Sequence, residues 1–259
     1  MPLALLALTI SAFAIGTTEF VIVGLVPTIA EQLAISLPSA GLLVSIYALG
    51  VAVGAPVLTA LTGRFARKKL LVALMVLFTA GNILAWQAPD YTTLVIARLL
   101  TGLAHGVFFS IGSTIATSLV PKEKAASAIA IMFGGLTVAL VTGVPLGTFI
   151  GQHFGWRETF LAVSLLGVIA LVASLLLVPS SIPGRASASL SDQVKVLTHP
   201  RLLLIYAVTA LGYGGVFTAF TFLAPMMQEL AGFSPGAVSW ILLGYGISVA
   251  IGNIWGGKL

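Results

Sequence analysis

Long runs of hydrophobic residues, separated by short polar breaks, follow one another from end to end of the chain. A helix needs about 20 mostly apolar residues to cross a bilayer. The runs of that length cover residues 3–28, 39–62, 70–88, 92–119, 125–151, 158–178, 202–228 and 236–257. The breaks between them carry proline, glycine, serine and aspartate, which interrupt helices. The pattern predicts an all-α protein with about eight transmembrane helices.

Composition supports a chain surrounded by lipid. Of the 259 residues, 59% are hydrophobic and 7% are charged, whereas soluble domains carry about 25% charged residues. Cysteine is absent, which excludes disulfides and cysteine metal sites. No phosphate-binding loop, metal-ligand cluster or nucleophile–base pair is present, so we expect neither an enzyme nor a metal or other cofactor.

Lysine and arginine gather in alternate loops. One set of loops holds Arg64, Arg67, Lys68, Lys69, Lys122, Lys124, Arg185, Lys195, Arg201 and Lys258. The other set holds only Arg157. Because loops rich in Lys and Arg stay in the cytoplasm, the pattern predicts a cytoplasmic N-terminus in an inner (plasma) membrane. The net charge of +5 thus reflects topology rather than nucleic-acid binding.

An internal repeat divides the chain into two parts. At an offset of 198 residues, Gly16 meets Gly214, Pro27 meets Pro225, Glu31 meets Glu229, Ser36 meets Ser234, Tyr47 meets Tyr245 and Gly54 meets Gly252. Repeats of the same direction after six helices are typical of transporters with two parallel halves. Chance identity between apolar helices is the alternative, and the constant offset argues against it.

The repeat predicts three segments: a six-helix bundle over residues 1–178, a cytoplasmic linker over 179–201, and the first two helices of a second bundle over 202–259. Within the linker, residues 190–197 could form a short interfacial helix. If the repeat is complete, we expect about 130 further residues and about twelve helices, which would make this chain a truncated form.

Several motifs carry a family resemblance along the whole chain. They are GTTEF at residues 16–20, YALGVAVGAP at 47–56, and GWRETF at 155–160. The chain resembles the major facilitator superfamily, and within it the bacterial drug and sugar efflux proteins of the AraJ/YdhP type. The resemblance implies a major facilitator fold, no enzymatic activity, and secondary transport driven by a proton gradient. The partners it implies are a lipid bilayer, protons and a small-molecule substrate, with the full-length protein a monomer.

The basic loop GRFARKK at residues 63–69 is similar to the signature that follows helix 2 in this superfamily. Arg64, Arg67 and Lys68 would form a cytoplasmic gating loop. Gly63 and Ala66 depart from the acidic residue and the glycine usual there, so a simple positive-inside anchor is an equal alternative.

The fifth run carries small residues at four-residue spacing. Gly135, Ala139, Gly143, Gly147 and Gly151 share a helix face, with Pro145 among them. Small residues on one face allow close helix approach, which is the simplest interpretation. GVPLG at residues 143–147 also resembles the antiporter motif of proton-coupled exporters, and this implies a role in conformational change.

Glu19, Arg98 and His105 are the candidate proton-coupling residues. Glu19 is the one acid deep in a predicted span, about 12 Å below the outer end of its helix, and Arg98 lies about 9 Å deep. A buried carboxyl group that exchanges a proton for a cation, or for Arg98, would couple transport to protons. A static Glu19–Arg98 pair is the structural alternative, and for His105 it is an ordinary packed, hydrogen-bonded side chain.

Aromatic residues on the second, seventh and eighth runs indicate a substrate cavity. The candidates for its wall are Tyr47, Tyr213, Phe217, Phe220 and Tyr245, because ligand cavities are lined mainly by apolar and aromatic side chains. Lipid-facing aromatics are the alternative. The sequence thus predicts an exporter of a drug or sugar that works by proton antiport. A uniporter, an uptake symporter, or a non-transporting receptor or scaffold remain open.

Overall fold

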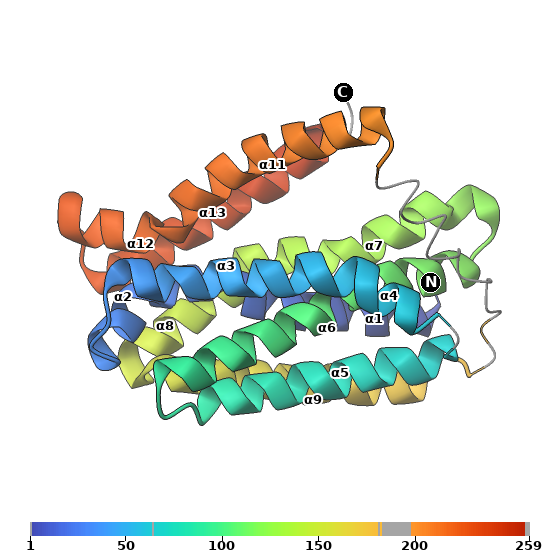
Figure 1. Cartoon of the computed structure of the whole chain (residues 1–259), viewed down its shortest axis with the longest axis horizontal. Coiled ribbons are helices and arrows are strands. Elements are labelled where there is room, and N and C mark those ends of the chain that lie inside the picture. Colours follow the sequence, from blue (N-terminus) through green and yellow to red (C-terminus); the bar gives the residue numbers. More distant parts are fainter. Residues whose placement is uncertain (1, 64, 181, 183–197, 257–259) are drawn as a thin grey trace.

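The computed structural model describes residues 2–63, 65–180, 182 and 198–256, and they form long helices joined by short connections (Figure 1). The first part contains α1 (Leu3–Phe20), α2 (Ile22–Gln32), α3 (Leu37–Val53), α4 (Thr59–Leu61), α5 (Arg67–Trp86), α6 (Tyr91–Ser118), α7 (Ala125–Val138), α8 (Val144–Phe154) and α9 (Trp156–Leu177). After the linker come α11 (Pro200–Thr221), α12 (Leu223–Pro225) and α13 (Pro235–Gly256). No strand occurs in these ranges.

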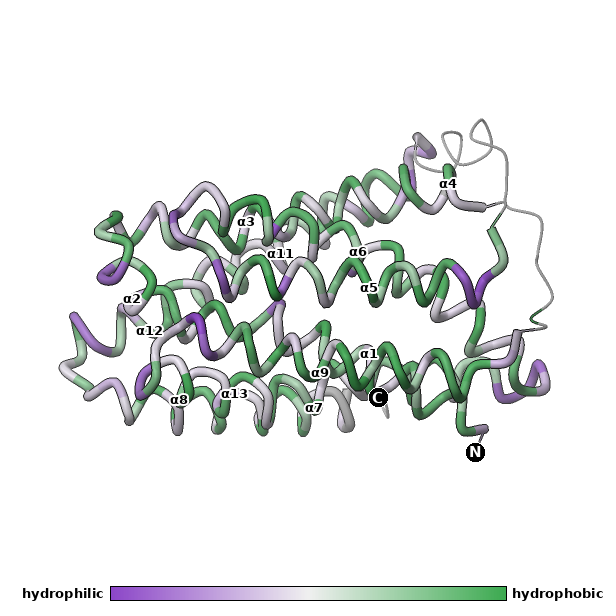
Figure 2. Tube along the Cα trace, turned by 90° about the horizontal axis from the view of Figure 1, so that it is seen from below, coloured by the Kyte–Doolittle hydropathy of each residue, from purple (hydrophilic) through white to green (hydrophobic). Residues whose placement is uncertain are grey.

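Eight of the helices in the described part are long and apolar enough to cross a membrane. The predicted fold class is confirmed. Most bounds follow the predicted runs to within a few residues, whereas the long helices of the first and seventh spans end earlier, at Phe20 and Thr221. Figure 2 shows hydrophobic positions along the length of the bundle and hydrophilic positions gathered mainly at its ends. Large apolar side chains such as Leu176, Leu211 and Trp240 are more than two-thirds exposed, as expected for a surface that lipid covers.

The first and seventh spans are each interrupted, which the hydrophobic pattern did not predict. Val21 separates α1 from α2, and Phe222 separates α11 from α12. Pro27 and Pro225 follow these breaks. A proline lacks the N–H group that the helix needs and its ring crowds the preceding turn, so a break on its N-terminal side is the physical consequence.

Three wide π-helical turns also lie within spans. They are η1 (Gly54–Leu58), η3 (Ala139–Gly143) and η4 (Met226–Leu230), and a single short 3-10 turn, η2 (Lys122–Lys124), precedes α7. Each π turn contains a proline or lies within two residues of one: Pro56, Pro145 or Pro225. A π turn shifts the backbone hydrogen bonds around the position where proline lacks an N–H group, so fewer carbonyls stay unpaired. Such turns are frequent at functional positions.

The helices up to α9 pack around α1. Helix α1 contacts α7 and α9, α3 packs on α6, and α5 lies between α6 and α9. Buried apolar side chains form one cluster around Leu8, Phe78 and Phe108, and a second cluster around Leu25 and Trp156. Between the two clusters lie the polar residues described below.

Helices α11 to α13 pack on one side of this bundle. Helix α12 contacts α2, and α13 contacts α8 and η3. In Figure 1, α11 lies closest to the first bundle near α12 and diverges from it toward the end where both chain termini lie. The first buried residues on α11 are accordingly Phe220 and Thr221, at its last turn.

The 198-residue repeat is visible in the helix starts. Helix α3 begins at Leu37 and α13 at Pro235, each directly after a serine. The Ser36 hydroxyl oxygen accepts the backbone N–H of Ser39 at 3.2 Å, and the Ser234 hydroxyl oxygen accepts that of Ala237 at 3.4 Å. Equivalent caps therefore start equivalent helices.

The described basic loops share the end of the bundle that holds the N-terminus (Figure 1). We call this end, which includes Arg67 and Lys122, the basic end. Several sequence predictions fall outside the described residues: Arg64, Arg185, Lys195, Lys258, most of the linker over 179–201, and the short helix over 190–197.

Candidate functional site

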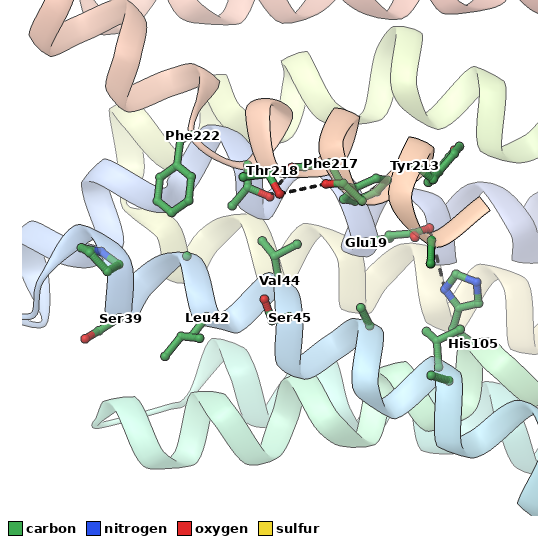
Figure 3. A pocket seen from close by; sticks show the side chains of 18 residues that line it. Glu19, Ser39, Leu42, Val44, Ser45, His105, Tyr213, Phe217, Thr218 and Phe222 are labelled. Atoms are coloured by element: carbon green, nitrogen blue, oxygen red, sulfur yellow. Dashed lines mark hydrogen bonds and ion pairs between the residues drawn. The ribbon is translucent and has the colours of Figure 1, made fainter. Parts of the chain in front are cut away.

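A carboxyl group and an imidazole lie side by side on the wall of a cavity between the helices. Glu19 lies at the end of α1 and His105 in the middle of α6. The Glu19 Oε2 atom lies 3.8 Å from His105 Nδ1, and the two side chains are 19% and 12% exposed. Both line the cavity (Figure 3). Since an imidazole is charged only when protonated, this pair can hold or release a proton.

Tyr47 on α3 is a second partner for the same imidazole nitrogen. Its hydroxyl oxygen lies 2.9 Å from His105 Nδ1. When the tyrosine donates this hydrogen bond, Nδ1 is an acceptor and the imidazole proton sits on Nε2. When His105 is doubly protonated, Nδ1 becomes a donor and can turn to Glu19. His105 Nδ1 therefore lies within reach of two partners, the Tyr47 hydroxyl and the Glu19 carboxylate.

Arg98 on α6 is fully enclosed and braces three helices. Its Nη1 donates to the carbonyl of Thr18 on α1 at 2.7 Å, and its Nε donates to the carbonyl of Leu43 on α3 at 3.3 Å. The guanidinium carbon lies 4.2 Å from the centroid of the Tyr47 ring, a cation–π geometry. Arg98 and Glu19 make no ion pair here, and Nη2 of Arg98 has no partner. Arg98 is thus held by carbonyls and an aromatic face rather than by the carboxylate.

Glycines bring α3 and α6 close enough for these contacts. A Cβ atom at Gly102 would overlap the carbonyl oxygen of Tyr47, and one at Gly106 would lie 2.6 Å from that of Val51. On the facing helix, a Cβ at Gly50 would lie 2.7 Å from the carbonyl oxygen of Leu99. Backbones that approach this closely exclude any larger residue. Arg98, Gly102 and His105 are four and three residues apart and share one face of α6, and this is the face that meets α3.

Thr18 and Asn82 form a buried polar contact that the sequence interpretation missed. The Thr18 hydroxyl donates to Asn82 Oδ1 at 2.6 Å, and Asn82 Nδ2 donates to the carbonyl of Phe78 at 2.9 Å. Thr18 thus binds α5 through its side chain and Arg98 through its carbonyl, directly before Glu19. An asparagine within an apolar run was the signal available, because such residues face a partner rather than lipid.

The cavity beside Glu19 and His105 has a volume of about 1010 Å³ and lies between α3 and α11. Of the predicted aromatic residues, Tyr213 and Phe217 line it, and their rings stack at 5.5 Å (Figure 3). Phe220 and Tyr245 lie behind this wall, stacked on each other at 4.6 Å. Tyr47 is 2% exposed and faces α6. These three were predicted on the wall and instead support it, because their helix faces turn toward neighbouring helices.

Other residues of the wall carried no sequence signal. They are mainly small and hydroxyl side chains, including Ser39, Ser45, Ala48, Thr218 and Thr221. At one end of the cavity the Phe222 ring fits against Gly41, where a Cβ atom would lie 2.8 Å from the ring. The break between α11 and α12 at Phe222 therefore directs this ring onto α3.

The glycine row on the fifth span packs along the first span. A Cβ atom at Gly135, Gly143, Gly147 or Gly151 would overlap Thr9, Thr17, Val21 or Leu25 respectively. Pro145 is buried at the start of α8, directly after η3. The row thus allows close contact between the two spans along their length, and its role in conformational change stays a prediction.

In the predicted gating loop, Lys68 donates to the carbonyl of Leu175 at 2.7 Å, and Arg67 is 9% exposed. Lys68 thereby ties the start of α5 to the last turn of α9, a place where a cation is favourable. At the opposite end Arg157 donates through Nε and Nη2 to the carbonyl of Ala88 at 3.1 and 2.8 Å. Across the described ranges, no group of His, Asp and Glu is arranged to hold a metal ion.

Comparison with known proteins agrees with the architecture. The family model described as Major Facilitator Superfamily matches residues 8–259. The chain belongs to the major facilitator superfamily. Its curated relatives are named as transporters.

Named relatives of this major facilitator chain are similar along almost its whole length. The uncharacterized MFS-type transporter YtbD of Bacillus subtilis (strain 168) is 56% identical over 99% of this chain and 65% of its own length. The inner membrane transport protein YdhP of Escherichia coli (strain K12) is 47% identical over 98% of this chain and 65% of its own length. This chain therefore spans about two-thirds of the length of these relatives.

Solved structures show the same major facilitator fold. A bacterial homologue of the human lysosomal transporter Spinster, in an inward-facing and occupied conformation, matches with a TM-score of 0.75 and 20% identity. The match covers 98% of this chain and 60% of that one. A D-xylose-proton symporter matches with a TM-score of 0.70 and 18% identity, over 94% of this chain and 65% of its own. At these identities the likeness concerns the fold alone.

Proposed function

We propose that this chain is part of a secondary transporter that exports a small organic molecule, a drug or a sugar, in exchange for protons. The observation that carries the proposal is the Glu19 carboxyl group on the cavity wall, 3.8 Å from His105. A proton carrier must be reachable from the cavity and must have a charge that changes during the cycle. Glu19 and His105 line the cavity and are both ionisable, which supports the proposal, whereas Arg98 is fully enclosed.

Alternating access would supply the conformational change. The second bundle touches the first near α12 and diverges from it toward the basic end (Figure 1). We propose that the basic end is cytoplasmic, in line with its lysines and arginines, and that this arrangement is an inward-facing state. The proposed location is a bacterial inner membrane, as the name of the inner membrane transport protein YdhP indicates for that relative.

Glu19→Gln tests the proposal, because it keeps the size and hydrogen bonding of the side chain and removes its titration. In proteoliposomes of the full-length protein with an imposed pH gradient, we expect gradient-driven flux of a panel of drugs and sugars to fall by at least tenfold. The variant should still fold, because the partners of Arg98 are carbonyls and the Tyr47 ring. Glu31→Gln is the matched control, since Glu31 is exposed at the end of α2.

Uphill flux of a panel compound by Glu19→Gln at the parent rate would remove Glu19 from the mechanism. Flux that ignores the pH gradient in the parent protein would indicate a uniporter. Accumulation in the same direction as protons would indicate a symporter. A parent protein that moves no panel compound while binding one would favour a receptor or scaffold.

A further inference from the structure

Asn82 on α5 reaches across to the last turn of α1. Its side chain is 0% exposed, and both of its polar atoms have partners. The Oδ1 atom accepts the Thr18 hydroxyl at 2.6 Å, and Nδ2 donates to the carbonyl of Phe78 in its own helix at 2.9 Å. Because the bond to Phe78 fixes the plane of the amide group, Asn82 presents Oδ1 to α1 in one orientation.

Thr18 connects Asn82 to the arginine that braces three helices. Its hydroxyl is held by α5, while its carbonyl accepts Arg98 Nη1 on α6 at 2.7 Å. Arg98 in turn donates to the carbonyl of Leu43 on α3 and lies over the Tyr47 ring. The side chain of Thr18 is 0% exposed. A single buried residue of α1 therefore carries both the contact with Asn82 and the contact with Arg98.

The directions of the Thr18 and Glu19 side chains are linked, because the two residues are neighbours in one helix. Successive residues of an α-helix point about 100° apart. Thr18 faces α5, while Glu19 faces the cavity, 3.8 Å from His105 Nδ1 (Figure 3). Any rotation of this turn about the helix axis would move both side chains. Since α1 ends at Phe20, contacts from the side matter more for the orientation of its last turn than they would within an uninterrupted helix.

From these observations we propose that Asn82 is a positioning residue. By holding the Thr18 hydroxyl, it fixes the rotation of the last turn of α1, and with it the Thr18 carbonyl at Arg98 and the Glu19 carboxyl group at His105. The inference rests on the proposed function, in which Glu19 and His105 handle the proton, and it adds the residue of α5 that orients them. Asn82 acts on this pair through Thr18.

The pH dependence of labelling at Glu19 measures this orientation without a substrate. Dicyclohexylcarbodiimide reacts with protonated carboxyl groups, and mass spectrometry of the purified full-length protein in detergent quantifies the labelled Glu19 at each pH. The midpoint depends on the ionisable groups that face Glu19, which are Arg98 and His105 from α6, Tyr47 from α3 and Tyr213 from α11. A rotation of the last turn of α1 changes the distances to these groups, and the midpoint then moves.

Two variants remove the same hydrogen bond from its two sides. Asn82→Leu and Thr18→Val each replace a polar side chain by an apolar one of similar size. We expect each to move the midpoint of Glu19 labelling by about half a pH unit or more. The double variant should show the same shift as either single one, because both changes remove one interaction. Thr18→Ser keeps the hydroxyl and should keep the parent midpoint.

Thr79→Val is the matched control on α5. Thr79 lies one turn before Asn82 and is 7% exposed, and its hydroxyl donates to the carbonyl of Met75 in its own helix at 2.8 Å. Its replacement removes a buried hydrogen bond without touching the contact with α1. We expect a lower melting temperature in detergent, as for the other variants, and an unchanged midpoint of Glu19 labelling. Melting thus reports packing, and the midpoint reports orientation.

An unchanged midpoint in Asn82→Leu or in Thr18→Val would overturn the inference. An equal shift in Thr79→Val would do the same, because loss of stability alone would then explain the effect. Additive shifts in the double variant would show two separate effects and would also contradict it. If Asn82→Leu does not fold, Thr18→Val carries the same prediction. Failure of both to fold beside a folded Thr79→Val would overturn a role in orientation alone.

Failure of the proposed function gives a different result. The labelling midpoint is measured in detergent without a gradient, whereas proton coupling is measured as flux by Glu19→Gln. Shifted midpoints together with uphill flux by Glu19→Gln at the parent rate would support the role of Asn82 and overturn proton coupling at Glu19. Unchanged midpoints together with loss of flux in Glu19→Gln would do the reverse.

Discussion

Arg98 shows how a charged residue can be held inside the bundle without a direct ion pair. Its Nη1 and Nε atoms reach the carbonyls of Thr18 and Leu43, and the Tyr47 ring covers its face. The sequence predicted that Arg98 and Glu19 lie at one level, from the number of residues to each helix end. It did not predict the carbonyl partners, because backbone groups are present everywhere and only the packing shows which are within reach.

The geometry of the guanidinium, rather than its charge alone, should hold this brace together. Arg98→Lys keeps the charge but cannot reach two carbonyls and stack on Tyr47 together. We expect a loss of stability of about 2 kcal/mol, the usual worth of a hydrogen bond to a charged group, seen as a lower melting temperature in detergent. Arg157→Lys is a matched control, because Arg157 also lies over an aromatic ring and donates twice to a carbonyl, but is less enclosed. Equal melting temperatures for Arg98→Lys and the parent would contradict the brace.

At the scale of whole helices, the hydrophobic pattern predicted where spans begin and end, and missed what interrupts them. The length of an apolar run predicts the length of the helix, because the thickness of the bilayer sets how many apolar residues a span needs. The breaks at Val21 and Phe222 and the π turn η3 depend on how neighbouring helices accept the groups that proline leaves unpaired. The aromatic residues behind the cavity wall were misplaced for the same reason: a face of a helix can be predicted, but not which neighbour it meets.

Helix α13 meets the π turn η3 through a glycine. A Cβ atom at Gly246 would overlap the carbonyl oxygen of Leu140 and lie 2.8 Å from the Val141 Cα atom. Backbone atoms cannot move aside cheaply, so Gly246→Ala should push α13 away from the first bundle. Gly244→Ala is the matched control, because a Cβ atom there meets nothing within 4 Å.

Disulfide trapping measures this separation. Gln152 and Ser239 join α8 to α13 through a 3.3 Å hydrogen bond, and the chain has no native cysteine. Cysteines at these two positions should cross-link efficiently in the parent and in Gly244→Ala, and several-fold less in Gly246→Ala. Undiminished cross-linking in Gly246→Ala would show that the packing of α13 on η3 accommodates a Cβ atom without moving α13 away.

Asp90 caps the start of α6 and gives a prediction for pH. Its Oδ1 accepts the backbone N–H of Thr93 at 2.8 Å, and this hydrogen bond holds the pKa of Asp90 below its ordinary value of 3.8. A lowered pKa in the folded state means that the cap stabilises above the ordinary pKa and is lost as the pH falls through the lowered one. Asp90→Ala should therefore melt at a lower temperature than the parent at pH 7, with the difference shrinking below about pH 4. A difference in melting temperature that stays constant with pH would exclude the charged cap. The melting temperature of Asp90→Asn should lie between those of the parent and Asp90→Ala.

For the whole molecule, the internal repeat predicted more of the arrangement of the spans than the composition did. It predicted that the seventh and eighth spans match the first and second, and the serine caps of α3 and α13 stand at matching positions. Where the second bundle sits relative to the first could not be predicted, because that depends on contacts such as Gly246 on η3 rather than on periodicity.

Orientation in the membrane is a prediction for the whole molecule. Ala66 and Gln87 are exposed at the two ends of α5. If the basic end is cytoplasmic, an impermeant thiol reagent added to whole cells should label Gln87→Cys and not Ala66→Cys, while both should react after the membrane is opened. Labelling of Ala66→Cys in intact cells would reverse the orientation.

The two carbonyl contacts made by Lys68 and Arg157 fasten α5 to α9 at both ends. Because contacts at both ends hold the two helices together, we expect α5 and α9 to move through a transport cycle as one rigid unit. We then expect the hinges of the conformational change at Val21 and Phe222, where the first and seventh spans are interrupted. Amide hydrogen exchange would register this as slow exchange shared by α5 and α9, with faster exchange at the two breaks.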